Sequence, residues 1–461
     1  MKRYLTLLVL ITLLAFGCSS EEDENHQQPD TGTTADVGAS DVDSPPFATG
    51  DTGHDTSDDA PDTGPTADTG DTDVAPGDTP DTGPTADTGP TADTGDDELP
   101  FSEFVTVDPN EPRFLLEGEP FYFAGTNLYW LMQWRTYGND NVDDALDVCD
   151  ELGLRVIRLW GFADGHEWTH DEDSAILQSE PGVFNETAFA ALDYIIAEAG
   201  ERDIKLIIPL INYWEDFGGM LQYAQWAGGS GYEFFYTDQA ARDLYRDYVE
   251  AVLTRVNTIT GVEYRDDPTI FAWELANEAN AYFDANASQN TLRDWYAEMA
   301  AHVRSLDANH LIATGEEGFD TPANSDEYTP LSNNWVYSGD SGTSYIDNTA
   351  LDDIDFAGAH LYPDAWSFSD ALADGNQWIT DHVDLAHAQG KPFVLGEFGN
   401  PDHSVYAQWL ETIEESGAAG SLLWELVPES RGATSDMHVV YPTDADLIEV
   451  FREHAQRMND R

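Results

Sequence analysis

Residues 271–278 read Phe271-Ala-Trp-Glu-Leu-Ala-Asn-Glu278, and residues 393–399 read Phe393-Val-Leu-Gly-Glu397-Phe-Gly399. In both stretches a short apolar, β-prone run stops at an acid, as in a strand that is buried in a parallel sheet. Glu278 and Glu397 are 119 residues apart, so only a closed fold brings them together. In a (β/α)8 barrel the C-terminal ends of all strands converge on one face. The two stretches therefore predict an α/β fold, a (β/α)8 TIM barrel, with both carboxylates on that face.

Alternating strand and helix patterns over residues 101–461 support the barrel. Strands are expected at 121–126, 156–160, 205–211, 270–275, 311–314, 355–360, 392–396 and 420–424. Helices are expected at 142–152, 186–201, 239–258, 291–306, 377–389 and 404–416. Gly153 and Gly390 stand where helices should end, because glycine readily takes the left-handed conformation found there. A doubly wound open sheet is the alternative, but no Gly-x-Gly-x-x-Gly motif follows the first strand.

Residues 1–17 have the pattern of a signal peptide, with two basic residues, an apolar run and a small residue at the end. The run is too short to span a membrane. Ala15-Phe16-Gly17-Cys18 resembles a lipobox, the bacterial signal for attaching lipid to a new N-terminal cysteine. We therefore expect an exported protein, lipid-anchored through Cys18 to the cell envelope at the outer membrane or cell surface, or else secreted. An ordinary secretory signal with an incidental cysteine is the alternative.

Residues 18–100 form a low-complexity segment in which Asp-Thr-Gly recurs at 62–64, 68–70, 81–83, 87–89 and 93–95. The segment holds 23 acidic residues and no Lys or Arg. It cannot bury enough apolar surface to fold, and its charges repel one another and extend it. A disordered acidic linker is therefore expected. Calcium binding is the alternative, but the regular Asp-x-Asp-x-Asp-Gly spacing is missing.

The acidity continues through residues 101–461, the expected catalytic domain. Of the 89 acidic residues in the chain, 66 lie there against 17 Lys and Arg, which leaves a net charge of −49 over 361 residues. Such a field repels nucleic acids and anionic membranes, and it suits a neutral substrate such as a polysaccharide. So acidic a domain also suggests adaptation to high salt.

Polar and aromatic groups cluster where the expected strands end. They include Arg158, Trp160, Trp214, Asn277, Glu278, Glu317, His360, Tyr362, Glu397 and Trp424. Each alone has an ordinary explanation, such as packing for a tryptophan or solvation for a strand-end glutamate. These ordinary explanations do not predict, however, that all eight loops place such groups at one rim of the barrel. Two acids that face one cleft, one protonated and one ionised, are the apparatus that cleaves glycosidic bonds.

At this point the chain resembles glycoside hydrolase family 5 and, within it, the endo-β-1,4-mannanases. The resemblance covers residues 104–460. It rests on Phe123-Ala-Gly-Thr-Asn127, Val156-Ile-Arg-Leu-Trp160, Asn212-Tyr-Trp-Glu-Asp-Phe-Gly-Gly-Met220, Trp273-Glu-Leu-Ala-Asn-Glu278, His360-Leu-Tyr-Pro363 and Gly396-Glu-Phe-Gly399. The resemblance implies a retaining double displacement, with Glu278 as general acid/base and Glu397 as nucleophile. The two carboxyl groups of a retaining pair lie about 5 Å apart.

The resemblance also implies the sugar-binding residues. Arg158 and Tyr362 would contact the nucleophile and hold it ionised, since a nearby guanidinium lowers the pKa of a carboxylate. The 2-hydroxyl of the sugar at the cleavage point, axial in mannose, would bond to Asn277, with His360 beside it. Trp424 would form the floor under that sugar, and Trp214 would be a wall further along the cleft.

One segment departs from the family pattern. Many members continue Asn-Glu with Pro and then Arg, whereas here Glu278 is followed by Ala279-Asn280. The missing arginine should weaken or alter the grip on sugars of the leaving side, without affecting the cleavage itself. Glu317, which corresponds to a leaving-side contact in relatives, is a further binding candidate.

No metal site or cofactor is expected. His360, His382, His387, His403 and His438 show no His-x-x-x-His or His-Glu-x-x-His spacing with a third ligand, and no nucleotide loop or Gly-x-Ser-x-Gly elbow is apparent. Cys149 lies in an amphipathic helical pattern, where a buried small hydrophobe is expected rather than a nucleophile. Cys18 and Cys149 are the only cysteines, so the folded domain cannot contain a disulfide.

The sequence thus predicts a monomeric, surface-anchored endo-β-1,4-mannanase acting on mannan, glucomannan or galactomannan. A β-mannosidase or a β-1,4-glucanase of the same family is the alternative enzyme. A non-catalytic glycan-binding surface lipoprotein is the alternative from another class, but it would require the loss of a carboxylate. Both Glu278 and Glu397 are present, which argues against it.

Overall fold

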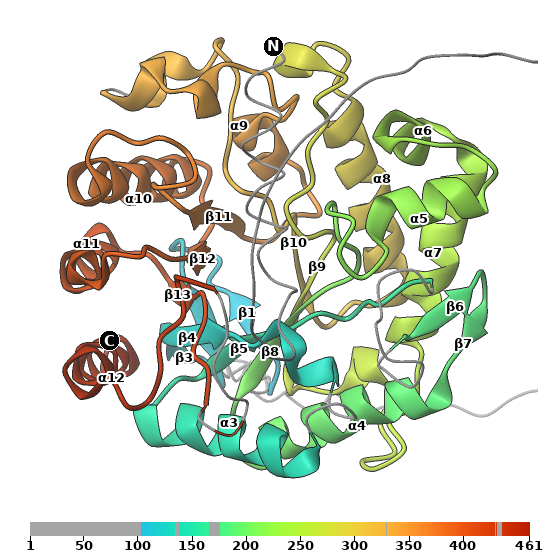
Figure 1. Cartoon of the computed structure of the whole chain (residues 1–461), viewed down its shortest axis with the longest axis horizontal. Coiled ribbons are helices and arrows are strands. Elements are labelled where there is room, and N and C mark those ends of the chain that lie inside the picture. The colour runs from blue at the N-terminus through green and yellow to red at the C-terminus, as the bar shows by residue number, and fades with distance from the viewer. Residues whose placement is uncertain (1–102, 134–137, 166–175, 329, 429, 431–435) are drawn as a thin grey trace, which may run out of the picture. The chain divides into compact units, whose positions relative to one another are not determined.

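The computed structural model describes residues 103–133, 138–165, 176–328, 330–428, 430 and 436–461 (Figure 1). The expected signal peptide, the linker and Cys18 lie outside these residues, so their predictions remain predictions. Within the described residues, no helix is both long and apolar enough to cross a membrane.

Eight parallel strands form the central sheet in the order β10-β9-β8-β5-β4-β13-β12-β11 (Figure 1). They are β4 (Phe123–Asn127), β5 (Val156–Arg158), β8 (Lys205–Pro209), β9 (Ile270–Glu274), β10 (Leu311–Ala313), β11 (Ala357–Leu361), β12 (Phe393–Phe398) and β13 (Gly420–Leu423). Backbone hydrogen bonds also join the two end strands, from Asp355 N to Ile312 O at 2.8 Å and from His360 N to Glu317 O at 3.1 Å. The predicted barrel and all eight predicted strands are confirmed.

The strands are buried on both faces, as their continuous apolar runs predict. Every residue of β4, β5, β9, β12 and β13 is buried. Strand β12 runs on through Glu397 to Phe398, so this acid lies within the strand and not after it. The register shifts between Leu395 and Phe398, where β12 pairs with β13.

Helices surround the barrel and connect its strands (Figure 1). They are α3 (Asn139–Leu152), α4 (Glu186–Gly200), α5 (Gly219–Trp226), α6 (Tyr232–Thr237), α7 (Gln239–Leu253), α8 (Thr291–Leu306), α9 (Tyr345–Thr349), α10 (Ala371–Ala388), α11 (Tyr406–Ser416) and α12 (Ala445–Asn459). The side chains of Asn185, Asp238 and Asp370 cap the first turns of α4, α7 and α10. Gly153 takes the left-handed conformation at the end of α3, as predicted, and Cys149 is buried inside this helix.

Short 3-10 helices occupy several loops. They are η1 (Tyr129–Gln133), η2 (Tyr264–Asp266), η3 (Ala285–Ala287), η4 (Ser325–Tyr328), η5 (Leu331–Asn333), η6 (Trp335–Tyr337) and η7 (His403–Val405). A small antiparallel pair, β6 (Gln178–Glu180) with β7 (Val183–Phe184), lies between β5 and α4.

An antiparallel sheet of β1 (Thr106–Val107), β2 (Phe114–Leu116) and β3 (Glu119–Phe121) precedes the barrel. Its aromatic side chains pack into the core cluster that also holds the first residues of the barrel strands. The ring centroid of Phe114 lies 5.0 Å from that of Phe271 and 5.4 Å from that of Phe356. The sheet therefore seals the N-terminal end of the barrel, which leaves the C-terminal end for the site.

The structure also corrects the sequence prediction. The strand expected at 121–126 is two strands, β3 and β4, separated at Tyr122. Helices α5, α6 and α9 fill loops that were not expected to be helical. Helix α12, which completes the ring after β13, was also missed, although its buried residues Ile448, Phe451, Ala455 and Met458 have helical spacing.

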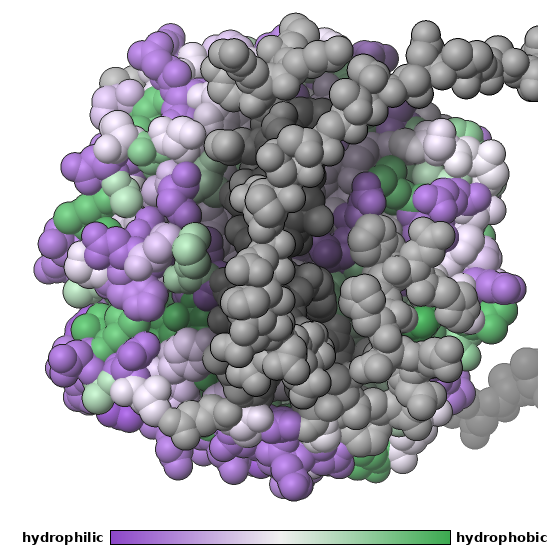
Figure 2. All heavy atoms as spheres, viewed as in Figure 1, coloured by the Kyte–Doolittle hydropathy of each residue, from purple (hydrophilic) through white to green (hydrophobic). Residues whose placement is uncertain are grey.

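Hydrophilic residues gather on the outer surface of the helices. Figure 2 shows them over α10, α11, α12 and α3, with smaller apolar areas between. This distribution agrees with the net negative charge of the domain, since the acids stay on the solvated faces of amphipathic helices.

Candidate active site

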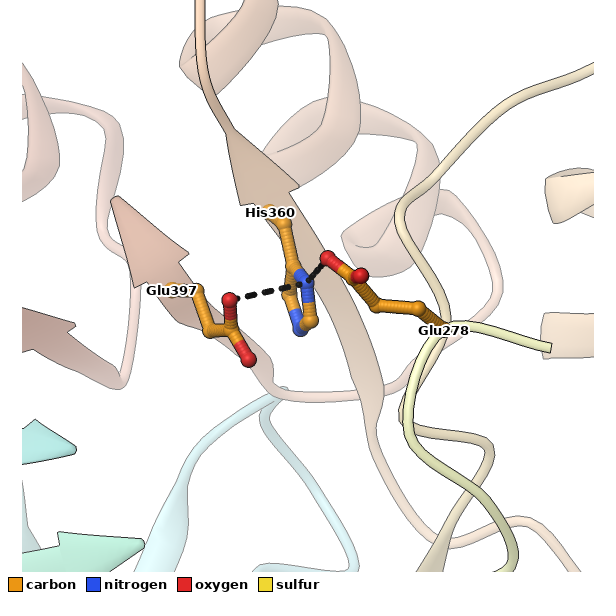
Figure 3. Close-up of side chains that lie close together, drawn as sticks. All are labelled: Glu278, His360 and Glu397. Carbon is orange, nitrogen blue, oxygen red and sulfur yellow. Dashed lines mark hydrogen bonds and ion pairs between the residues drawn. The ribbon is translucent and has the colours of Figure 1, made fainter. Parts of the chain in front are cut away.

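Glu278 and Glu397 meet at the C-terminal end of the barrel, on either side of His360 (Figure 3). Glu397 comes from β12, His360 from β11 and Glu278 from the loop after β9. One carboxylate oxygen of each glutamate and Nδ1 of His360 all lie within 4.8 Å of one another. The two acids that the sequence singled out are therefore brought together by the closed barrel.

Arg158, at the end of β5, is fully buried and binds four acceptors. Its Nη1 donates to Glu397 Oε1 at 2.6 Å and to Asn127 Oδ1 at 3.1 Å. Its Nε donates to Glu274 Oε2 at 2.8 Å, and its Nη2 donates to Asn277 Oδ1 at 2.8 Å. A planar guanidinium with this many fixed partners has one orientation, so its charge stays beside Glu397.

Glu397 is surrounded by groups that favour its ionised form. Burial raises the pKa of its carboxyl above the ordinary value, and the nearby negative charge of Glu278 raises it as well. Arg158 opposes this rise, as does the hydroxyl of Tyr362, which donates to Glu397 Oε2 at 2.7 Å. If only one of the two buried acids is ionised, it is therefore Glu397, which accepts a hydrogen bond from Arg158.

Glu278 has no such cation in direct contact. Trp214 Nε1 donates to its Oε2 at 2.6 Å, and His360 Nδ1 lies 2.7 Å from its Oε1. Burial raises the pKa of Glu278, with the Trp214 hydrogen bond and the charge of Arg158 acting against the rise. A proton shared by the pair thus belongs on Glu278 rather than on Glu397.

His360 is neutral at physiological pH. Burial lowers its pKa to about 4, despite the opposing charge of Glu397, whose Oε2 lies 3.6 Å from Nδ1. Its Nδ1 is the nitrogen near both acids, and in a neutral imidazole it can bond to Glu278 as donor or acceptor, depending on the tautomer. His360 therefore serves as a hydrogen-bonding spacer and not as a counter-ion.

The backbone at Glu278 is held in an uncommon conformation. Its φ is 53°, in the left-handed region that residues other than glycine rarely adopt. Its N–H donates to Gly315 O at 2.8 Å. A Cβ on Gly315, whose φ is 74°, would lie 2.1 Å from the carbonyl oxygen of Ala276, so the loop after β10 can approach this closely only with glycine there.

The residues expected to bind the sugar at the cleavage point lie around the two acids. Asn277 Nδ2 donates to Asn212 Oδ1 at 3.0 Å, which leaves its second N–H for a ligand. Trp424 stacks on Tyr129 with ring centroids 5.2 Å apart and an interplanar angle of 5°. Its Nε1 donates to Asp436 Oδ2 at 2.9 Å. The indole is thus fixed in plane and half-buried.

Glu317 lies beside Glu278 and is 8% exposed. Asn280 Nδ2 donates to Glu317 Oε2 at 2.8 Å and also to the carbonyl oxygen of Glu278 at 2.9 Å. Burial and the charge of Glu278 raise the pKa of Glu317 well above its ordinary value. Asn280 therefore supplies an uncharged hydrogen-bond donor to Glu317.

Glu278, His360 and Glu397 also form the one group of potential metal ligands found among the described residues. Three protein ligands and an open position are the donor set of a catalytic zinc. Here, however, each side chain is engaged in hydrogen bonds at 2.6–2.7 Å within the site. The expectation that no metal takes part stays a prediction.

The sequence reasoning did not assign several residues that hold this site. Asn127 and Glu274 accept from Arg158, and Asn212 orients Asn277. Asn127 and Glu274 stand in motifs that carried the family resemblance. Their polarity at an otherwise apolar strand end was the available signal.

A second cluster, Asp364, His438 and Asp436, lies behind Tyr362. His438 Nδ1 is 3.0 Å from Asp436 Oδ1, and its Nε2 is 3.3 Å from Asp364 Oδ2. The ring centroid of His438 lies 5.4 Å from that of Tyr362. Asp436 also accepts from Trp424 Nε1, so this cluster joins Trp424 to the tyrosine that binds Glu397.

Comparison with known proteins agrees with this geometry. Residues 102–414 match the family model described as glycoside hydrolase family 5 β-mannosidase-like. Mannan endo-1,4-β-mannosidase 1 of Arabidopsis thaliana is 37% identical over 365 residues, which are 73% of this chain and 85% of the relative.

Solved structures resemble the chain to a similar degree. The endo-β-1,4-mannanase from Thermotoga petrophila superposes with a TM-score of 0.69 at 37% identity, over 74% of this chain and 78% of that one. The endo-1,4-β-mannanase from Rhizomucor miehei has a TM-score of 0.69 at 34% identity, over 78% of this chain and all of the other. The chain therefore belongs to glycoside hydrolase family 5, in its β-mannosidase-like group.

Proposed function

We propose that this family 5 glycoside hydrolase is an endo-acting, retaining β-1,4-mannanase that hydrolyses mannan-type polysaccharides. The observation that carries the proposal is the pair Glu278 and Glu397, with one oxygen of each and His360 Nδ1 all within 4.8 Å of one another. Retaining glycosidases hold their carboxyl groups about 5–5.5 Å apart, whereas inverting enzymes leave about 6.5–9.5 Å for a water molecule. The short separation favours attack by a carboxylate.

In the first step, Glu397 attacks the anomeric carbon and forms a glycosyl ester. Glu278 gives its proton to the glycosidic oxygen, so the leaving sugar departs as a neutral alcohol. The contacts suit these roles, because Arg158 and Tyr362 stabilise the anionic form of Glu397 while Glu278 is buried without a direct cation.

In the second step, Glu278 acts as a base. It takes a proton from a water molecule, and the resulting nucleophile attacks the anomeric carbon and breaks the ester. Glu397 leaves as a carboxylate, and the sugar keeps its β configuration. Arg158, 2.6 Å from Glu397 in the free enzyme, stabilises the carboxylate that is released in this step.

Recognition of mannose would rest on three residues. The free N–H of Asn277 faces the position of the 2-hydroxyl, which is axial in mannose, and His360 lies beside it. Trp424 offers a fixed aromatic face for the sugar ring. The relatives at 34–37% identity are named as mannan endo-β-mannosidases or endo-mannanases, which supports a mannan substrate over a glucan.

The negative charge of the domain also limits the kinds of polymer that can approach it. At −49 over residues 101–461, a neutral polymer such as mannan, glucomannan or galactomannan approaches without repulsion, unlike nucleic acid. We propose a monomer held at the cell envelope by lipid on Cys18, with residues 18–100 as a flexible tether. The lipobox-like residues 15–18 and the acidic composition of the tether support this part.

One assay tests the central proposal. Purified protein is given mannan, glucomannan and carboxymethylcellulose, the products are sized, and early hydrolysis is followed by proton NMR. We expect a rapid fall in the length of mannan and β anomers appearing before mutarotation. Release of single mannose units from an intact polymer would favour the β-mannosidase alternative, and preference for carboxymethylcellulose would favour the glucanase. If α anomers appear first, the retaining mechanism is wrong.

A further inference from the structure

A cluster of aromatic rings lies beside Trp214 and has no role in the chemistry described above. We define it as the tyrosine platform of Tyr213, Tyr232 and Tyr282. The ring of Tyr213 stacks on that of Tyr232 at 4.2 Å between centroids, and its centroid lies 5.1 Å from that of Trp214 and 6.4 Å from that of Tyr282. The three rings thus form one continuous group reached from the indole that binds Glu278.

Two loops at the C-terminal end of the barrel and the start of a helix build this platform. Tyr213 follows β8, Tyr282 stands four residues after Glu278 in the loop that follows β9, and Tyr232 is the first residue of α6. Tyr213 is 5% exposed and Tyr232 is half-buried, so these two rings form a packed base. Tyr282 lies against that base and is 41% exposed.

The exposure of Tyr282 is unusual for this protein. Among the residues that the structure describes, it is the single aromatic member of the exposed large hydrophobic group, whose other members are Val183, Val256, Ile259 and Met437. Water-exposed ring surface forgoes about 25 cal/mol for each Å² that is left unburied. Tyr282, which lies against Tyr213, therefore offers an exposed ring that an apolar face of a ligand can cover.

The position of the platform places that ligand on the leaving side. Tyr282 is within electrostatic range of both Glu317 and Glu278. Arg158 and Tyr362 instead contact Glu397. Since Glu278 protonates the oxygen of the departing sugar, groups beyond Glu278 and Trp214 lie along the path of the released chain.

The charges around the platform define the class of ligand. The carboxylates of Glu215 and Asp216 interact electrostatically with Tyr232, and that of Asp340 interacts electrostatically with Tyr282. Carboxylates around an aromatic face accept hydrogen bonds from hydroxyl groups and repel anions. A neutral hexose, with an apolar C–H face and hydroxyls on its rim, fits such a surface, and a uronic acid does not.

We propose that Tyr282, supported by Tyr213 and Tyr232, forms a stacking subsite for a neutral β-1,4-linked hexose of the leaving chain, beyond the sugar that is directly bonded to the cleavage point. The subsite rests on the proposed mannanase function and deepens it. Neutral stacking here would take over part of the grip that an arginine at position 280 provides in relatives, because Asn280 is turned to Glu317.

The test compares Tyr282→Ala, Tyr282→Phe and Tyr282→Trp with wild-type enzyme. The control is Ile259→Ala, which removes another exposed apolar side chain (57%) from the loop between α7 and β9, at the opposite end of the barrel. Substrates are mannotetraose to mannohexaose, cleaved in ¹⁸O-labelled water to identify the broken bond, and an aryl β-mannobioside. The aryl group ends at the first leaving-side position and cannot reach the platform.

For Tyr282→Ala we expect a rise in KM of about three- to tenfold on mannohexaose, the scale of one lost aromatic contact. The cleavage pattern should shift so that fewer sugars lie on the leaving side. Hydrolysis of the aryl mannobioside should stay at the wild-type rate, and Tyr282→Phe and Tyr282→Trp should restore the wild-type pattern. Ile259→Ala should match the wild type throughout.

Two results would overturn the subsite. One is an unchanged cleavage pattern in Tyr282→Ala. The other is an equal loss on mannohexaose and on the aryl mannobioside, which would mean that Tyr282 only supports the fold near Glu278. Failure of the proposed function is distinct from both, because the wild-type enzyme would then leave every mannan oligosaccharide intact.

Discussion

Arg158 Nη1 lies 2.6 Å from Glu397 Oε1, and both side chains are buried inside the barrel. The two residues come from β5 and β12 and are 239 positions apart in the chain. Because Glu274 and Asn277 hold the other nitrogens of the guanidinium, the cation cannot follow a substrate or turn towards solvent. Glu397 is thus kept next to a positive charge before any sugar arrives.

We expect Arg158→Lys to lower kcat on mannan by at least about a hundredfold, the scale of one lost preorganised charged contact. A lysine keeps the charge but cannot hold Asn127, Glu274, Asn277 and Glu397 together. The measurement is steady-state kinetics beside urea unfolding. Arg155→Lys, three residues earlier, half-buried and bonded to the carbonyl oxygen of Asp203, is the control and should change neither quantity. Comparable kcat for the two variants would refute the proposed role of Arg158.

Glu397→Ala and Glu278→Ala should each stay folded and lose about 10²–10⁴-fold or more of activity on intact polymer. Azide should rescue Glu397→Ala with a glycosyl azide of inverted configuration, because the small anion replaces the missing nucleophile from the same face. Glu411→Ala, on the exposed side of α11, serves as the control. Activity near the wild-type level in either active-site variant would contradict the assigned roles.

We expect the folded domain to lose stability at alkaline pH, as His438 loses its proton. Burial lowers its pKa, but its bonds to Asp364 and Asp436 and their charges raise it to about 9. A pKa raised in the folded state contributes stability that is complete below about pH 6.5, the ordinary value, and is lost as the pH rises through 9. We expect the free energy of unfolding of the wild type to exceed that of His438→Asn by about 1–3 kcal/mol at pH 6 and by little at pH 10.

Urea unfolding at each pH measures this difference, and hydrolysis rates in the same buffers report on Tyr362 and Trp424, which the cluster joins. His302→Asn, which removes an imidazole from α8, is the control. A difference that stays constant from pH 6 to pH 10 would mean that the charge of His438 does not contribute.

Added salt should stabilise the catalytic domain. At −49 over 361 residues the surface charges repel one another, and salt shortens the Debye length from about 30 Å at 0.01 M to about 3 Å at 1 M. A neutral substrate gains nothing from long-range charge, so activity should not fall in return. Melting temperatures between 0.05 M and 1 M sodium chloride provide the measurement. A flat or falling series would mean that the acids are already locally paired, and salt adaptation would have to be abandoned.

Cys18→Ser should release the protein from membranes or leave its signal peptide unprocessed. The small residue before Cys18 and the acidic tether after it motivate this expectation. Incorporation of labelled palmitate, followed by membrane fractionation, gives the readout, with Cys149→Ser as the control since Cys149 is buried in α3. Equal labelling of the wild type and Cys18→Ser would exclude the anchor.

The barrel strands could be predicted because each is a short, continuous apolar run between polar loops, and burial on both faces demands that composition. The helices found in advance have strong periodicity and, in α3, a terminal glycine. Those that were missed are short, such as α9, or lie beyond the last expected strand, as α12 does. The small sheet at residues 106–121 was missed because its strands of two or three residues carry no detectable alternation.

The acids of the site were predictable for a related reason. Glu278 and Glu397 interrupt apolar runs, and the motifs around them resemble those of a known family. Asp364 and His438 gave no such signal, because they lie in separate loops 74 residues apart and acquire meaning only as neighbours. Tyr282 likewise differs from any other loop tyrosine only through the rings that support it.

The sequence by itself determined the eight strands, the closed barrel and the choice of two glutamates, because local composition and periodicity record which segments are buried. Only the tertiary structure decided how these residues act on one another. The spacing of Glu278 and Glu397 across His360, the four contacts of Arg158 and the neutral state of His360 all depend on atoms that come from distant strands. Distances of this kind set pKa values and reactivity, and they exist only once the barrel has closed.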